Sequence, residues 1–277
     1  MCFAADSIVY IVSGRMPNGR YSKTMLCYDT RTDSWEEVSL PITARVNGAA
    51  CVTTQGIFMG LGYKGSTINK AENYIRDWWR FDPHDGSWQQ LTDFPSDKTD
   101  AAVCWSDNQS IWVCSGFHGY TDDMWRYDID SDSWGQAPYQ TPLRVMSAVA
   151  AKCQNRYFYG TGYRRQSKTD WYEWFSEGRW EKRASVPGGR LNAACAATQD
   201  AVWIIGGWHY GDSLTTGFHY EDILQYTPEN NTWTRCGTIP CGPTENSAAC
   251  AIGNRIYFGL GEAPDGQLHQ HWYYLDE

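Results

Sequence analysis

The sequence predicts an all-β protein built as a β-propeller of six similar sheets. The composition is the first observation, because 15 Trp, 18 Tyr and 26 Gly favour short strands and tight turns over helices. The second is a repeat with two markers in phase, a glycine that ends an aromatic strand and a tryptophan that begins a later one. The glycines are Gly14, Gly62, Gly116, Gly162, Gly207 and Gly261, and the tryptophans are Trp35, Trp88, Trp134, Trp180 and Trp233. Repeats of roughly 40–50 residues with four strands each are typical of propeller blades.

Each repeat reads as four antiparallel strands, named a to d in chain order. In the first repeat these are CFAA from Cys2, IVYIV from Ile8, MLCYD from Met25 and SWEEV from Ser34. One such sheet cannot bury both of its faces alone, so each blade must stack on its neighbours. No stretch of a dozen residues has the 3.6-residue apolar period of an amphipathic helix.

The chain is predicted to be one β-propeller domain, residues 1–277, because no linker or low-complexity tract interrupts it. The predicted blades are residues 1–41, 42–95, 96–142, 143–187, 188–240 and 241–277. The last repeat ends in WYYLDE, where strand c finishes without a strand d. The sixth blade is therefore expected to lack its outer strand, either because it has three strands or because its closing strand has been lost from the chain. An open strand edge there would invite pairing with another chain, and the oligomeric state stays undetermined.

Three features together resemble the kelch repeat. Strand b can end in a glycine pair, as at Gly206-Gly207; strand c ends in an aromatic residue and Asp, as at Tyr28-Asp29; and a Trp follows about six residues later. Runs such as GLGY and DWWRFDP are similar to kelch proteins of Bacteroidetes type. The resemblance implies the fold but not the activity, because kelch propellers include protein-interaction modules, sugar mutarotases and the galactose oxidase propeller.

The cysteines occupy one repeated position rather than pairs. Six of them fall in the predicted strand a, and five of the six occur at a similar distance before strand b: Cys2, Cys51, Cys104, Cys195 and Cys250, with Cys153 slightly later. We expect them to pack as small apolar residues near the propeller axis. A ring of thiols that holds a soft metal is the alternative, but no CxxC pair supports it, so no metal and no cofactor is expected. Unpaired thiols favour a cytoplasmic location, and an exported or cell-surface one applies if a leader precedes the chain.

Charge and hydropathy restrict the partners. A net charge of −9 argues against nucleic acid or an anionic membrane surface as the main partner. No apolar run approaches the roughly 20 residues of a membrane span.

Ligand binding is expected on the face that carries the b-c and d-a loops, because strands alternate in direction and these loops are the longer and less repetitive ones. Arg45, Arg144 and Arg190 each precede a strand a. In kelch proteins this position faces the mouth of the central channel, and a guanidinium fork matches a carboxylate; the alternative is an arginine that caps its own blade. The other candidate binding residues are Asn47, Asn192, Tyr63, His118, Tyr163, Arg164, Trp208 and His209.

Two functions follow from this face. The first is a non-enzymatic binding propeller that recognises an acidic peptide or protein, or an acidic glycan, since the sequence has no nucleophile elbow, HExxH or phosphate loop. The alternative is a carbohydrate mutarotase resembling the kelch-type sialic acid epimerases, in which Glu245 or His209 moves the proton. The sequence lacks the motif of a copper oxidase such as galactose oxidase. Whether the protein is an enzyme is left undecided, with binding preferred.

Overall fold

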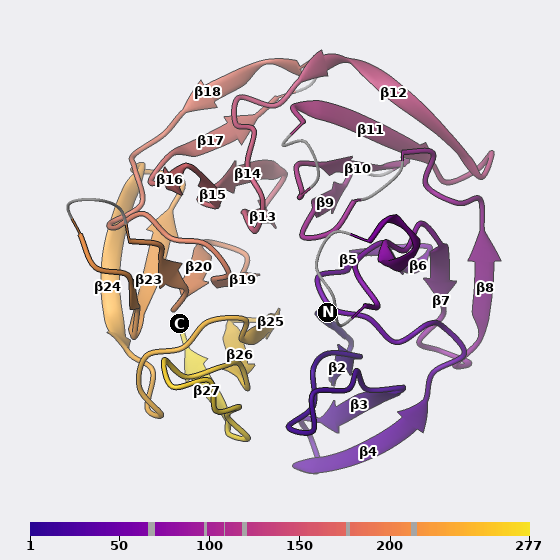
Figure 1. Ribbon diagram of the computed structural model, residues 1–277, viewed down its shortest axis with the longest axis horizontal. Helices are drawn as coiled ribbons and strands as arrows, with labels where there is room; N and C mark the ends of the chain where they lie inside the picture. The colour runs from indigo at the N-terminus through magenta and orange to yellow at the C-terminus, as the bar shows by residue number, and fades with distance from the viewer. Residues whose placement is uncertain (66–69, 97–98, 108, 118–120, 176–177, 212–214) are drawn as a thin grey trace. The chain divides into compact units, whose positions relative to one another are not determined.

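The computed structural model describes residues 1–277 except 66–69, 97–98, 108, 118–120, 176–177 and 212–214. Apart from the short 3-10 helix η1, Ala71–Asn73, the described residues form strands and loops. They divide into two compact units, Met1–Thr141 and Pro142–Glu277, and three blade sheets follow one another along the chain in each unit (Figure 1). The predicted all-β fold with six propeller blades is confirmed. No helix among the described residues is long and apolar enough to cross a membrane.

The first unit holds three four-stranded antiparallel sheets whose strands pair in sequence order. The strands are β1 Cys2–Ala5, β2 Ile8–Val12, β3 Thr24–Asp29 and β4 Ser34–Ser39; β5 Ala49–Thr53, β6 Gly56–Gly60, β7 Trp78–Phe81 and β8 Trp88–Leu91; and β9 Val103–Ser106, β10 Ser110–Cys114, β11 Asp123–Asp128 and β12 Ser133–Gln140. The first strands, β1, β5 and β9, lie next to one another.

The second unit repeats this plan with two additions. Its strands are β13 Val149–Cys153, β14 Arg156–Gly160, β15 Tyr163–Arg164, β16 Gln166–Ser167, β17 Trp171–Trp174 and β18 Trp180–Lys182; β19 Ala194–Ala197, β20 Val202–Ile205, β21 Trp208–His209, β22 Phe218–His219, β23 Asp222–Thr227 and β24 Thr232–Thr238; and β25 Ala248–Ile252, β26 Arg255–Gly259 and β27 Trp272–Asp276. The last sheet has three strands, as predicted. The hairpins β15-β16 and β21-β22 lie within b-c loops.

The repeated tryptophan packs against the aromatic residue at the end of strand c. Trp35 pairs with Tyr28 across the strands, and Trp134 with Tyr127, with ring centroids 4.8 and 4.9 Å apart. Such aromatic cross-strand pairs contribute about 0.5–1.5 kcal/mol beyond the area they bury. This contact explains why the tryptophan keeps a fixed spacing from the aromatic residue that ends strand c.

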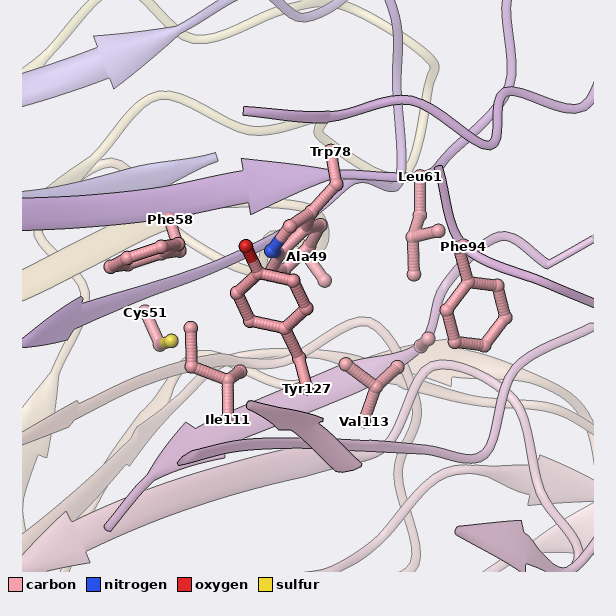
Figure 2. Packing of buried hydrophobic residues seen from close by; sticks show 10 residues of the cluster. Ala49, Cys51, Phe58, Leu61, Trp78, Phe94, Ile111, Val113 and Tyr127 are labelled. Carbon is pink, nitrogen blue, oxygen red and sulfur yellow. The ribbon is translucent and has the colours of Figure 1, made fainter. Parts of the chain in front are cut away.

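Large aromatic side chains fill the space between neighbouring blades. In the first unit, Trp78 of β7 and Phe58 of β6 meet Tyr127 of β11, with the small Cys51 beside them (Figure 2). All ten cysteines are free thiols. Burial raises the pKa of the Cys195 thiol to about 12, so this side chain stays protonated at neutral pH.

A left-handed residue precedes each marker glycine. Its φ is between 57° and 62° at Ser13, Leu61, Ser115, Thr161, Gly206 and Leu260. Glycine adopts this conformation without the strain that a Cβ brings, which is the physical reason for a glycine pair. Only the fifth blade has the full pair, and there a Cβ on Gly206 would lie 2.5 Å from the Thr244 carbonyl oxygen.

Candidate functional site

The b-c and d-a loops meet at a repeated backbone contact. In five blades the residue after the marker glycine forms an antiparallel bridge with a residue of the d-a connection, and the residue after that one is left-handed, with φ between 52° and 56°. The bridges are Val46 with Tyr63, Asp100 with Phe117, Met146 with Tyr163, Leu191 with Trp208, and Glu245 with Glu262. The two kinds of loop therefore share a face, as predicted, and four of the five b-c positions are aromatic.

Arg45 is buried in an ion pair with its own blade. Its guanidinium donates two hydrogen bonds to the Asp77 carboxylate, the Nη2–Oδ2 one 2.8 Å long. It also donates to the carbonyl oxygens of Leu61 at 3.1 Å and Thr43 at 2.8 Å. The Arg45 side chain is 0% exposed, so its charge is fully engaged inside the blade.

Arg190 repeats this arrangement in the second unit. It donates to the Asp222 carboxylate at 2.6 and 3.1 Å and to the carbonyl oxygens of Gly206 at 3.0 Å and Pro187 at 2.7 Å. Its side chain is also 0% exposed. A buried guanidinium must be paired to be tolerated, so both arginines tie the d-a connection to the start of strand c and shape the loops around the site.

Arg144 does not occupy the same position as the other two. The Met146–Tyr163 bridge corresponds to Val46–Tyr63 in the second blade, so the counterpart of Arg45 is Val145, which is buried, with 1% of its surface exposed. Arg144 lies one residue earlier and is exposed. The expected recurrence of three equivalent arginines is therefore corrected to two, because the register shifts by one residue.

Glu245 is the centre of a polar network in the second unit. Its Oε2 accepts a hydrogen bond of 2.6 Å from Asn192 Nδ2, and its Oε1 lies 3.2 Å from His219 Nε2. The backbone supports this geometry, because Asn192 is left-handed and its carbonyl accepts a 2.9 Å bond from Asn246 N. The side chains of His219 and Glu245 are each 13% exposed. We call Asn192, His219 and Glu245 the Glu245 network.

An aromatic surface adjoins the Glu245 network. The hairpin β21-β22 pairs Trp208 with His219, and their rings stack with centroids 5.8 Å apart and planes at 11°. Tyr210 packs beside Trp208 at 5.0 Å and beside Tyr163 at 4.8 Å, and Tyr210 is 44% exposed. We call Tyr163, Trp208 and Tyr210 the aromatic wall. The half-buried Arg164 follows Tyr163 in β15.

His209 points into different surroundings from Glu245. Its Nδ1 is 3.0 Å from the Gly189 carbonyl oxygen, its Nε2 is 3.4 Å from Thr215 Oγ1, and its ring stacks on Phe218 at 5.0 Å. The imidazole partner of Glu245 is His219, which our choice of site residues missed. The signal was present in the lengthened b-c loop, because a hairpin that begins at Trp208 places His219 opposite it.

The first unit holds a smaller version of the same arrangement. Asn47 Nδ2 donates to Asp100 Oδ2 at 3.2 Å, as Asn192 does to Glu245. Asp100 is 8% exposed, and this burial raises the pKa of its carboxyl group despite the Asn47 hydrogen bond. Tyr63 packs edge-on against Tyr74 at 5.0 Å. The predicted site residue His118 lies outside the described residues.

No group of three or more His, Cys, Asp or Glu side chains in the described part of the chain is arranged to hold a metal ion.

Sequence comparisons connect the chain to known proteins. The Kelch motif model matches residues 2–39. N-acetylneuraminate epimerase of Yersinia pestis (strain Pestoides F) is 23% identical over 252 residues, which are 86% of this chain and 56% of that protein. Kelch repeat and BTB domain-containing protein 1 of vaccinia virus (strain Copenhagen) is 22% identical over 263 residues, 93% of this chain and 45% of that protein. The chain thus spans about half the length of these relatives.

A solved structure described as "Structure of YjhT" has the same fold. It superposes with a TM-score of 0.78 over 98% of this chain and 92% of that one, at 15% sequence identity.

Proposed function

The chain belongs to the kelch-repeat β-propellers, and on that premise we propose that it binds an acidic sugar on the b-c and d-a loop face of its second unit. The observation that carries this proposal is the Glu245 network beside the aromatic wall. Tyr and Trp rings stack on the apolar face of a sugar ring. A carboxylate and an amide at the edge of that surface, here Glu245 and Asn192, hydrogen-bond ring hydroxyls and fix the orientation.

The acidic group of the ligand would be met by arginines of the fourth blade. Arg144 is exposed on the d-a connection, and Arg164 sits in the b-c hairpin next to Tyr163. A guanidinium bonds a carboxylate bidentately. Arg45 and Arg190 act indirectly, because their ion pairs hold the loops in place. The name of the epimerase relatives also refers to an acidic sugar.

A second candidate is mutarotation of the bound sugar, favoured by the 3.2 Å contact between His219 Nε2 and Glu245 Oε1. Ring opening breaks the bond between the anomeric carbon and the ring oxygen and forms a carbonyl. Glu245 would take the proton of the anomeric hydroxyl while His219 gives one to the ring oxygen. Reclosure on the other face of the carbonyl reverses both transfers.

Saturation-transfer NMR with N-acetylneuraminic acid tests the binding proposal. We expect transfer to the sugar protons with the wild-type chain, and binding about tenfold weaker for Trp208→Ala, which removes the stacking surface. Glu229→Gln is the matched control, because Glu229 is exposed in a c-d turn on the opposite face, and it should bind like wild type. Absence of transfer with wild type at millimolar sugar would contradict the proposal.

Proton NMR of the freshly dissolved α-anomer separates the two candidates. A mutarotase speeds the approach to anomeric equilibrium, and Glu245→Gln abolishes that acceleration. A binder leaves the rate at that of buffer while transfer is still seen.

A further inference from the structure

An open groove with a volume of about 730 Å³ lies in the first unit. Its residues belong to the first two blades, whereas those of the Glu245 network belong to the second unit. Its walls are the b-c loop of the first blade, around Arg20 and Tyr21, and the d-a connection from Leu40 to Ala44. Lys64, from the b-c loop of the second blade, completes it. The volume is within the roughly 300–1,000 Å³ of ligand-binding pockets.

The groove concentrates positive charge in an acidic chain. Arg20, Lys23 and Lys64 line it and are exposed, and no Asp or Glu is among the described lining residues. None of the three cations forms an ion pair with another described residue, whereas exposed arginines elsewhere, such as Arg31 with Asp29, do. With a net charge of −9 on the chain, these uncompensated cations create a local positive potential that attracts an anionic partner.

Hydrogen bonds fix both walls of the groove. The Tyr21 hydroxyl donates to the Gly65 carbonyl oxygen at 2.8 Å, and Leu40 N donates to the Lys23 carbonyl oxygen at 2.9 Å. On the other wall, Arg45 Nε holds the Thr43 carbonyl oxygen at 2.8 Å. The groove is therefore formed before any ligand arrives, which lowers the entropy cost of binding.

The lining favours a peptide over other anions. Pro41 and Ala44 give the groove an aliphatic side that a phosphate ion or a polyphosphate would not use. The backbone N–H groups of Thr43 and Ala44 have no backbone acceptor among the described residues, so a carbonyl oxygen of a bound peptide can accept a hydrogen bond from this connection. The three cations then match acidic side chains along that peptide.

We propose that this groove binds an extended acidic peptide of a partner protein, at a site separate from the sugar site of the second unit. Fluorescence anisotropy with a labelled peptide of alternating glutamate and alanine tests it, with a glutamine-alanine peptide as the ligand control. We expect binding of the acidic peptide only, weakening as salt screens the charges.

Matched double variants locate the contact. Lys23→Gln with Lys64→Gln should weaken peptide binding about tenfold. Lys182→Gln with Arg235→Gln removes two exposed positive charges from the second unit and should weaken it less than about twofold. All four side chains are exposed, so thermal midpoints should stay close to wild type. Trp208→Ala should leave peptide binding unchanged, which separates this proposal from the sugar proposal.

Three results would overturn the inference. The first is equal weakening by the two double variants, which means attraction by overall charge alone. The second is no binding of the acidic peptide by wild type at low salt. The third is competition in which inorganic phosphate or a sulfated glycan displaces the peptide from the groove and binds it more tightly, which assigns the site to a different anion.

Discussion

Replacing Asp222 by asparagine removes one partner of a buried ion pair and tests whether Arg190 is structural. The Arg190 side chain is 0% exposed and that of Asp222 is 14% exposed. Removing one partner of a buried pair costs about 3–5 kcal/mol, because the remaining charge stays buried without compensation. The Gly206 and Pro187 carbonyl oxygens still accept from Arg190, so we expect the lower value, about 3 kcal/mol.

Thermal unfolding followed by circular dichroism measures this cost. At roughly 2 °C per kcal/mol for a chain of this size, the midpoint of Asp222→Asn should fall by about 6 °C. Arg144→Gln is the control, because Arg144 is exposed and lies one residue before the position that corresponds to Arg190. This substitution should change the free energy of unfolding by less than about 0.5 kcal/mol. Adding Arg190→Met to Asp222→Asn should recover part of the loss, since no buried charge then remains.

The reasoning is refuted if Asp222→Asn unfolds at the same temperature as Arg144→Gln. The ion pair would then not be what ties the d-a connection to strand c.

Three further perturbations test other parts of the structure by thermal unfolding. Gly206→Ala should lower the free energy of unfolding by about 2 kcal/mol, because a Cβ there would lie 2.5 Å from the Thr244 carbonyl oxygen; an unchanged midpoint would contradict this. Burial acts to raise the pKa of Glu173, but hydrogen bonds from Arg156 and Arg183 outweigh it and hold that pKa below its ordinary value of 4.5. The stabilisation by ionised Glu173 is therefore present above pH 4.5 and lost as the pH falls through the lowered pKa. The difference in free energy of unfolding between wild type and Glu173→Gln should narrow in acid, and a difference that stays constant with pH would contradict the lowered pKa. Burial raises the pKa of Asp100, so the free energy of unfolding of wild type should increase as the pH falls from neutral toward that pKa. The Asp100→Asn variant cannot titrate at this position and should not show this increase. Equal pH profiles of the two proteins would contradict a raised Asp100 pKa.

The fold was predictable because its determinants are local and repeated. The Trp35–Tyr28 and Trp134–Tyr127 contacts each join residues seven apart in the chain, so the pattern that creates the blade is visible as spacing. The Gly206-Gly207 pair reports a left-handed turn in the same way.

The site was less predictable because its determinants are distant. The role of Arg190 depends on Asp222, which no local motif links to it, and a one-residue shift in register separates Arg144 from its apparent equivalents. Glu245 finds His219 only because the β21-β22 hairpin folds back onto Trp208. The basic groove joins Arg20, a d-a connection and Lys64 from three segments.

The most direct test of the sugar-binding proposal is a titration of the ¹⁵N-labelled chain with N-acetylneuraminic acid, following the tryptophan indole N–H signals, with the Trp208 signal assigned from Trp208→Phe. The chain has 15 tryptophans, and the buried ones, which include Trp78, Trp171 and Trp203, serve as internal controls. The account predicts that the Trp208 indole signal shifts in a saturable way while signals of buried residues such as Trp78 and Trp171 stay in place. Saturable shifts of other indoles with Trp208 unmoved would contradict it.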